Sequence, residues 1–187
     1  AIDRHAYLRA FSGNPKPSIF YVPAYLEKAV HAKIQGTAAR QLGKPPPYRV
    51  VVIRPGETVE LRKGLCVRPF ETIHRIPSQG YVVFDVRQKL KPEFADLPGQ
   101  EIGRLRKSGT VVTNRVEVPL VAFTGDTQAK VFDTPGAADA LKAKVLITEC
   151  TYVGDADTPK KARARGHVHL DELAERANLF QNEAVLL

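Results

Sequence analysis

The sequence predicts an α/β fold in which sheets pack together and helices lie outside them. Short runs of β-branched and aromatic residues fill the middle of the chain. Toward both ends, such runs alternate with segments whose apolar residues recur at helical spacing. The chain has 187 residues, of which 43% are apolar and 26% are charged. That length and balance are typical of a globular domain with a substantial core.

The first quarter of the chain alternates helix and strand. Residues 1–12 carry apolar side chains on one helical side, and the Gly-Asn-Pro sequence at 13–15 ends that helix. Residues 18–22, SIFYV, predict a short buried strand. Pro23 then stands at the expected start of a second helix, because proline is favoured in a first helical turn. Glycines and three prolines near residues 36–47 end this region.

The middle of the chain is richer in strands. Residues 49–53 predict one strand, and residues 58–61 and 65–70 predict a pair joined across Arg-Lys-Gly. Residues 81–86, YVVFDV, predict another strand. Residues 110–124 carry one or two more.

The last third returns to alternating elements. A short helix over residues 135–142 leads into a strand at 144–148. A loop rich in Asp, Lys and Arg is expected from 154 to 166. Residues 170–180 then predict an amphipathic helix, with Leu170, Leu173, Ala174, Ala177 and Phe180 on its buried face.

Composition narrows the function classes. The formal net charge is +8, which favours a polyanionic partner, nucleic acid first, although a basic protein that is merely soluble has the same composition. No apolar run approaches the roughly 20 residues of a membrane span, so we expect no membrane partner. Two distant cysteines and the lack of a signal-peptide pattern predict a reducing, cytoplasmic location.

The two ends of the sequence suggest a part of a longer protein. The chain contains no Met, and it ends on an apolar run, residues 183–187, that resembles an interrupted strand. We therefore expect further sequence on both sides.

Residues 118–127, VPLVAFTGDT, are the segment around which the site is expected. An apolar run ends abruptly at Gly125 and Asp126, which predicts a buried strand that presents one carboxylate at a tight turn. A carboxylate placed there suits a metal ligand, since its two oxygens can bridge two ions. The alternative is a turn that merely contains an Asp.

His74 lies in the segment TIHRIPSQGY, after a predicted strand and before a loop. A neutral imidazole at a strand end is a common zinc ligand. The alternative is a loop histidine that bonds to the backbone. His74 and Asp126 alone do not complete a catalytic zinc site, which needs about three protein ligands and a water.

A second histidine, His167, lies in the segment GHVHL at the start of the last predicted helix. A histidine side chain suits a donor of a proton to a leaving oxygen, because an unperturbed imidazole gains and loses its proton near neutral pH. Glu149, at the end of the segment LITE, is placed to orient that imidazole. His169 is expected only to cap or pack, and the alternative for both histidines is a pair of polar residues at a helix start.

The segment over residues 88–109 is polar and basic, with a short helix expected at 100–107. Its cations are candidates for phosphate contacts, and the alternative is a solvated basic face. These candidate RNA-binding residues are Lys89, Lys91, Arg104, Arg106 and Lys107.

Four segments in this order, PFETIHRIPSQGYVVF, VAFTGDT, KVLITECTY and GHVHLDELAERA, closely resemble the second half of transfer-RNA 3′-end processing endonucleases of the ribonuclease Z family. That family belongs to the metallo-β-lactamase superfamily. The resemblance covers most of the chain from about Ile19 to Leu187. It implies a four-layer αββα sandwich with a two-zinc site at one sheet edge, as a single, partial domain over residues 1–187 with a short basic insertion at about 88–109.

The resemblance also implies roles for four residues. His74 matches a metal-binding histidine, Asp126 matches the bridging aspartate, and His167 matches the histidine assigned to proton transfer, with Glu149 as its neighbour. The family's His-x-His-x-Asp-His motif and its last metal histidine are absent from this sequence. They would lie just before Ala1 and just after Leu187, so the two-zinc site is incomplete in this chain.

The expected function is a zinc-dependent endoribonuclease that processes the 3′ end of precursor transfer RNA, which is the expected partner, and that forms a homodimer. One alternative is another hydrolase of the superfamily that acts on small phosphodiesters or esters. The other is an RNA-binding homologue that has lost catalysis. The basic segments favour RNA, while missing metal ligands favour the non-catalytic homologue if the sequence is the whole gene product.

Overall fold

The computed structural model describes all residues except 1, 14–15, 42, 155 and 157. The chain divides into two compact units, Ala1–Glu57 and Thr58–Leu187. That the two units form one domain stays a prediction.

The first unit is a small two-stranded sheet with helices packed against it. Strand β1 (Ser18–Val22) pairs in parallel with β2 (Tyr48–Val52). The helices are α1 (Ile2–Phe11) and α2 (Glu27–Gln41), with the short helix η1 (Ala24–Leu26) leading into α2. A parallel pair needs a crossover connection, and α2 supplies it. Ile34 on α2 is fully buried, and it belongs to one apolar cluster with Val22.

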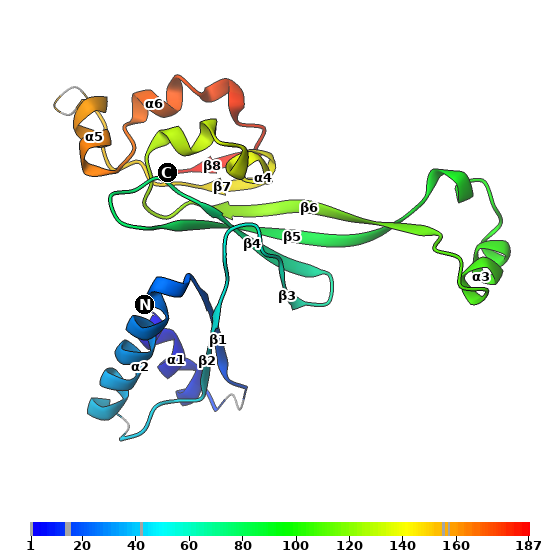
Figure 1. Cartoon of the computed structure of the whole chain (residues 1–187), viewed down its shortest axis with the longest axis horizontal. Coiled ribbons are helices and arrows are strands. Elements are labelled where there is room, and N and C mark those ends of the chain that lie inside the picture. Colours follow the sequence, from blue (N-terminus) through cyan, green and yellow to red (C-terminus); the bar gives the residue numbers. More distant parts are fainter. Residues whose placement is uncertain (1, 14–15, 42, 155, 157) are drawn as a thin grey trace. The chain divides into compact units, whose positions relative to one another are not determined.

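The second unit is built on a six-stranded sheet (Figure 1). The strands follow chain order across the sheet, antiparallel from β3 to β6 and parallel from β6 to β8. They are β3 (Val59–Arg62), β4 (Leu65–Glu71), β5 (Gln79–Leu90), β6 (Thr113–Phe123), β7 (Val145–Ile147) and β8 (Ala184–Leu186).

Short helices bury one set of side chains from this sheet. Phe84, Ala122 and Leu146 lie on neighbouring strands and are at most 1% exposed. They form one apolar cluster with residues of the helices and with Val168 and Leu173. The helices are η3 (Ala129–Asp133), η4 (Pro135–Ala137), α4 (Ala138–Lys142), α5 (Pro159–Arg165), α6 (Leu170–Ala174) and η5 (Ala177–Leu179).

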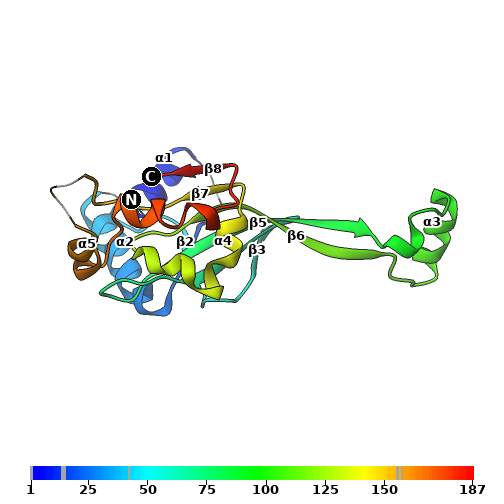
Figure 2. The ribbon, with the colours of Figure 1, turned by 90° about the horizontal axis from the view of Figure 1, so that it is seen from above.

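Strands β5 and β6 run far beyond their neighbours as a paired arm (Figure 2). Their pairing continues to Leu90 opposite Thr113. At the tip lie the short helix η2 (Pro92–Phe94) and helix α3 (Gly99–Lys107). The basic segment 88–109 therefore forms the end of a two-stranded arm, and the strand expected at 81–86 is longer than the sequence predicted.

Two predictions about the last third were wrong. The expected loop 154–166 contains α5, because Thr158 accepts a hydrogen bond from the Lys161 N–H as an N-cap, Pro159 follows it, and Gly166 ends the helix at φ +88°. The helix expected over 170–180 stops at Ala174 and is followed by η5. Of its expected buried face, Leu173 is buried, whereas Leu170, Ala174 and Ala177 are exposed.

Parts of four predictions lie outside the described residues: the first residue of the helix expected at 1–12, two residues of the break at 13–15, residue 42 of the segment 36–47, and residues 155 and 157 of the loop. Among the described helices, none has the length and apolar composition needed to cross a membrane.

Candidate active site

Three strands of the second unit run in the same direction and end at one edge of the sheet. Strand β4 is antiparallel to β5, β5 is antiparallel to β6, and β6 is parallel to β7. The carboxyl ends of β4, β6 and β7 therefore share an edge, and the segments after them carry His74, Asp126 and Glu149.

The structure brings the predicted residues to one place. The donor atoms of Asp126, Glu149 and His167 all lie within 4.8 Å of one another. The rings of His74 and His167 meet edge to face, with centroids 5.2 Å apart. Two candidate metal ligands and the candidate proton donor with its orienting carboxylate are thus neighbours, although they lie up to 93 positions apart in sequence.

Glu149 is held by four hydrogen bonds. Its Oε1 accepts from His167 Nδ1 at 2.8 Å and from the Thr127 N–H at 2.9 Å. Its Oε2 accepts from Thr151 Oγ1 at 2.6 Å and from the Val168 N–H at 3.3 Å. Burial raises the pKa of Glu149, but these hydrogen bonds together outweigh it and hold the pKa below its ordinary value. Glu149 is therefore an ionised acceptor.

Backbone contacts fix His167 between two helices. Its N–H donates to the Ala162 carbonyl of α5 at 3.0 Å. The next residue, Val168, is fully buried. Because an ionised Glu149 can only accept, His167 Nδ1 carries the proton of their hydrogen bond. No described residue hydrogen-bonds to Nε2, so this second ring nitrogen is the one that can act on a substrate.

The Nε2 of His74 also has no hydrogen-bond partner among the described residues, and this atom is buried. Such an unsatisfied atom costs roughly 1–3 kcal/mol, and a metal ion would satisfy it. The Ile76 N–H donates a long hydrogen bond of 3.4 Å to Nδ1. Nε2 would bind a metal ion in the tautomer that carries the proton on Nδ1, and that tautomer gives up only this long bond.

The residues present fit a divalent metal ion. His74 offers an unsatisfied nitrogen, and Asp126 offers an exposed carboxylate at the end of its turn. Imidazole nitrogen and carboxylate oxygen are donors that zinc accepts. Glu149 fits less well as a ligand, since both of its oxygens already accept two hydrogen bonds each.

Gly166 lets the end of α5 approach His74. A Cβ added at Gly166 would lie 2.8 Å from His74 Cδ2 and 3.1 Å from the Arg75 backbone nitrogen. Its φ of +88° is also unfavourable for any other residue. A side chain here would push apart the segments that carry His74 and His167.

We therefore expect Gly166→Ala to lower stability and to displace His74 from His167. The left-handed backbone alone costs about 1–2 kcal/mol, and the contact with His74 adds to it. The matched control is Gly109→Ala, because Gly109 has a φ of +86° but open space around its Cβ position. Unfolding midpoints and the NMR signals of the His74 and His167 rings measure the difference between the two variants, and equal changes in both would contradict a role for Gly166 in the site.

His169 caps α6, as the sequence predicted. It is 2% exposed, and its Nδ1 accepts from the Asp171 N–H at 3.2 Å. The Glu172 side chain accepts from the His169 N–H at 3.3 Å, which completes a capping box. This histidine is committed to the helix start.

The candidate RNA-binding residues lie on the arm, away from this cluster. Arg104, Arg106 and Lys107 form the last turn of α3, and all three are exposed. Lys89 is exposed near the end of β5, and Lys91 lies 3.8 Å from a carboxylate oxygen of Glu93. Figures 1 and 2 both place the tip of the arm and α5 at opposite ends of the second unit.

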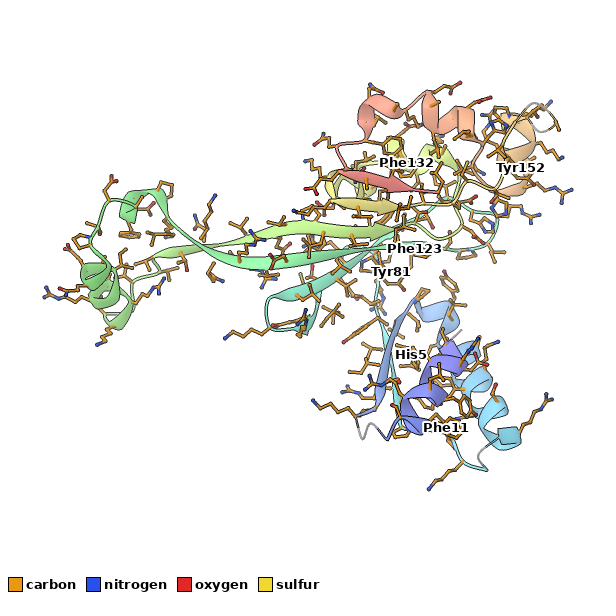
Figure 3. The ribbon with its side chains drawn as sticks, turned by 180° about the vertical axis from the view of Figure 1, so that it is seen from behind. His5, Phe11, Tyr81, Phe123, Phe132 and Tyr152 are labelled. Carbon is orange, nitrogen blue, oxygen red and sulfur yellow. The ribbon has the colours of Figure 1, made fainter. Side chains whose placement is uncertain are left out.

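Sequence reasoning missed several residues that support the site. Thr127 and Thr151 donate hydrogen bonds to Glu149, and Gly166 lies directly against His74. Tyr152 also lies near His167, with ring centroids 6.3 Å apart, beside α5 (Figure 3). Only Gly166 had a usable signal, since a glycine after a run of helix-forming residues indicates a helix end.

Comparison with known proteins shows close sequence relatives. The chain is 39% identical over 175 residues to a chloroplastic tRNase Z of Arabidopsis thaliana, covering 93% of this chain and 49% of the relative. It is 39% identical over 178 residues to a second Arabidopsis tRNase Z, covering 92% and 61%. A nuclear ribonuclease Z of Triticum aestivum is 39% identical over 123 residues, covering 60% of this chain and 69% of the relative.

The chain therefore spans about half of the first of these curated relatives and about three fifths of the second.

Human tRNase Z, short form, matches in structure with a TM-score of 0.56 at 17% identity, over 95% of this chain and 62% of that one. A metallo-β-lactamase fold protein from Bacillus subtilis matches with a TM-score of 0.51 at 13% identity, over 98% of this chain and 55% of that one. No protein-family model matches the chain. The structural matches show the metallo-β-lactamase fold.

Proposed function

Because the chain belongs to the ribonuclease Z family, we propose that the protein is a zinc-dependent endoribonuclease that cuts precursor transfer RNA after its discriminator region. The observation that carries the proposal is the meeting of Asp126, Glu149 and His167 within 4.8 Å, with the His74 ring against His167. One site therefore contains candidate metal ligands and the His167 imidazole, which Glu149 holds by a hydrogen bond.

His74 and Asp126 would hold a divalent metal in this proposal. When bound, the ion supplies positive charge that stabilises the negative charge developing on the phosphodiester. Glu149 keeps the proton on His167 Nδ1, which leaves Nε2 as the atom that carries a proton to the leaving oxygen. The same carboxylate stabilises the imidazolium while that proton is held.

The arm favours a polymeric RNA over a small phosphodiester. Strand β5 has 12 residues, which at about 3.3 Å per residue span roughly 35–40 Å. A substrate that contacts both the cations of α3 and His167 must be of similar length. A structured RNA meets that requirement, whereas a small ester reaches only one of the two places.

Charge removal at the tip of the arm tests this role. The triple change of Arg104, Arg106 and Lys107 to Ala is expected to weaken transfer-RNA binding and to make its salt dependence shallower. The slope of log affinity against log salt should fall in magnitude by up to about 0.9 for each lost phosphate contact. Affinities measured at several salt concentrations, with wild type alongside, give both quantities.

A comparison variant with Lys160, Lys161 and Arg165 changed to Ala removes the same number of charges from α5. If the α3 variant keeps the wild-type slope, its cations serve solubility. The RNA-binding surface is then assigned to α5 beside His167, and the α5 variant instead shows weaker binding and a shallower slope.

Substrate preference tests the proposed function itself. The protein is incubated with a precursor transfer RNA that carries a 3′ trailer, and separately with a small phosphodiester such as bis(p-nitrophenyl) phosphate. We expect one cut in the RNA, next to the discriminator, and much slower hydrolysis of the small ester. Efficient hydrolysis of the small ester without RNA cleavage would favour another hydrolase of the superfamily. RNA binding without hydrolysis of either substrate would favour the non-catalytic homologue.

Two finer expectations belong to this proposal. A homodimer is expected, and light scattering of the purified protein measures it. The cytoplasmic location stays a prediction, since two of the relatives are named for the chloroplast and the nucleus.

A further inference from the structure

Residues Thr127 and Gln128, directly after Asp126, connect all the segments of the candidate site. Thr127 is fully buried, and its Oγ1 accepts from the Ile73 N–H at 3.1 Å. Its own N–H donates to Glu149 Oε1 at 2.9 Å. One residue thus binds both the segment that carries His74 and the carboxylate that holds His167.

Gln128 extends the same connection in two directions. Its N–H donates to the Ile73 carbonyl at 2.7 Å. Its side-chain Nε2 donates to the Arg163 carbonyl of α5 at 3.0 Å. Since α5 is followed by Gly166, which lies against His74, the contacts form a closed loop around the site.

We propose that Thr127 and Gln128 are positioning residues. They hold His74, Glu149 and His167 at fixed positions relative to Asp126. The inference rests on the proposed function for its catalytic consequence, but its geometric part concerns these side chains alone. Neither residue is assigned a contact with a reacting atom. They act through the Ile73 backbone, the Glu149 carboxylate and the end of α5.

Chemistry at this kind of site is sensitive to small displacements. A misplacement of about 1 Å can cost roughly 100-fold in rate. Contacts far from the reacting atoms stay in place. Removing the Thr127 hydroxyl leaves the Ile73 N–H without its partner, and that segment is free to shift. Because the RNA contacts of the arm lie elsewhere, the loss should appear in kcat and not in KM.

The test compares Thr127→Val, which keeps the side-chain shape, with Thr127→Ser, which restores a hydroxyl. Thr134→Val is the matched control, since the Thr134 hydroxyl donates to the Val131 carbonyl at 2.7 Å in η3, outside the site. Gln128→Met is a second variant that keeps length and removes the donor to α5. Measurements are kcat, KM and the NMR signals of the His167 ring.

We expect Thr127→Val to lower kcat by roughly 10- to 100-fold, with KM within about twofold of wild type. Thr127→Ser should recover most of the rate, and Gln128→Met should lower kcat in the same direction. The His167 ring signals should shift in Thr127→Val and in Gln128→Met but not in Thr134→Val.

A Thr127→Val variant with wild-type kcat and unshifted His167 signals overturns the inference, as does a loss that Thr127→Ser fails to recover. If Thr127→Val does not fold, the same judgement rests on Gln128→Met. The NMR comparison needs no substrate. A wild-type protein that cleaves no RNA would therefore count against the proposed function, while shifted or unshifted ring signals still decide the positioning role.

Discussion

In the full-length protein, replacing Asp126 with alanine is expected to abolish metal binding and cleavage together. Asp126, Glu149 and His167 form a cluster of possible metal ligands among the described residues, and the Asp126 carboxylate is the exposed one. Glu149 already accepts four hydrogen bonds. Loss of Asp126 should leave His74 without a second ligand. Zinc content by mass spectrometry and the rate of precursor cleavage, measured on the same preparation, check the prediction.

A control variant separates this effect from a general loss of negative charge. Glu60 is exposed on β3, and strands β4 and β5 separate β3 from β6. Glu60→Ala should therefore keep both metal and activity. Full zinc content and normal turnover in Asp126→Ala would remove Asp126 from the metal site.

The second large effect concerns His167. In the full-length protein, we expect His167→Ala to lower kcat by roughly 10²–10⁴, the usual scale for a general acid–base group, with zinc content retained. The physical reason is that Glu149 holds Nδ1 and leaves Nε2 to move the proton. Single-turnover cleavage rates with a matched metal assay distinguish lost chemistry from lost metal.

His169→Ala is the natural comparison, since it changes the neighbouring histidine. His169 caps α6 and is buried, so its loss should lower the free energy of unfolding by about 0.5–2 kcal/mol and leave kcat close to wild type. An equal loss of kcat in both variants would show that His167 has no special role.

The order of residues along the chain is enough to indicate much of this site. Asp126 and Glu149 each follow an apolar run that ends abruptly, and such runs become the parallel strands β6 and β7. Parallel neighbours end at one edge, so these carboxylates meet because β6 and β7 pair in parallel, and the strand pattern indicates only that each carboxylate lies at a strand end. His74 is harder to place, because its position at that edge depends on the pairing of β4 with β5.

Other features have no such signal. The α5 sequence PKKARAR has no apolar stripe to reveal a helix, and the caps at Thr158 and Gly166 are weak signals without one. The contacts of Thr127 and Gln128 join segments 22 to 55 positions away, and a single sequence does not specify such pairs. The arm was underestimated for a related reason, since the end of β5 is polar and exposed and lacks a buried face to predict it.

The most direct test of the proposed metal site is anomalous diffraction at the zinc edge from crystals of the full-length protein grown with zinc. We expect a peak at coordination distance from His74 Nε2 and from the Asp126 carboxylate, with the hydrogen bond between Glu149 and His167 intact. A peak bound instead by Glu149 and His167, with His74 Nε2 still without a ligand, would contradict the assignment of ligand and proton-transfer roles.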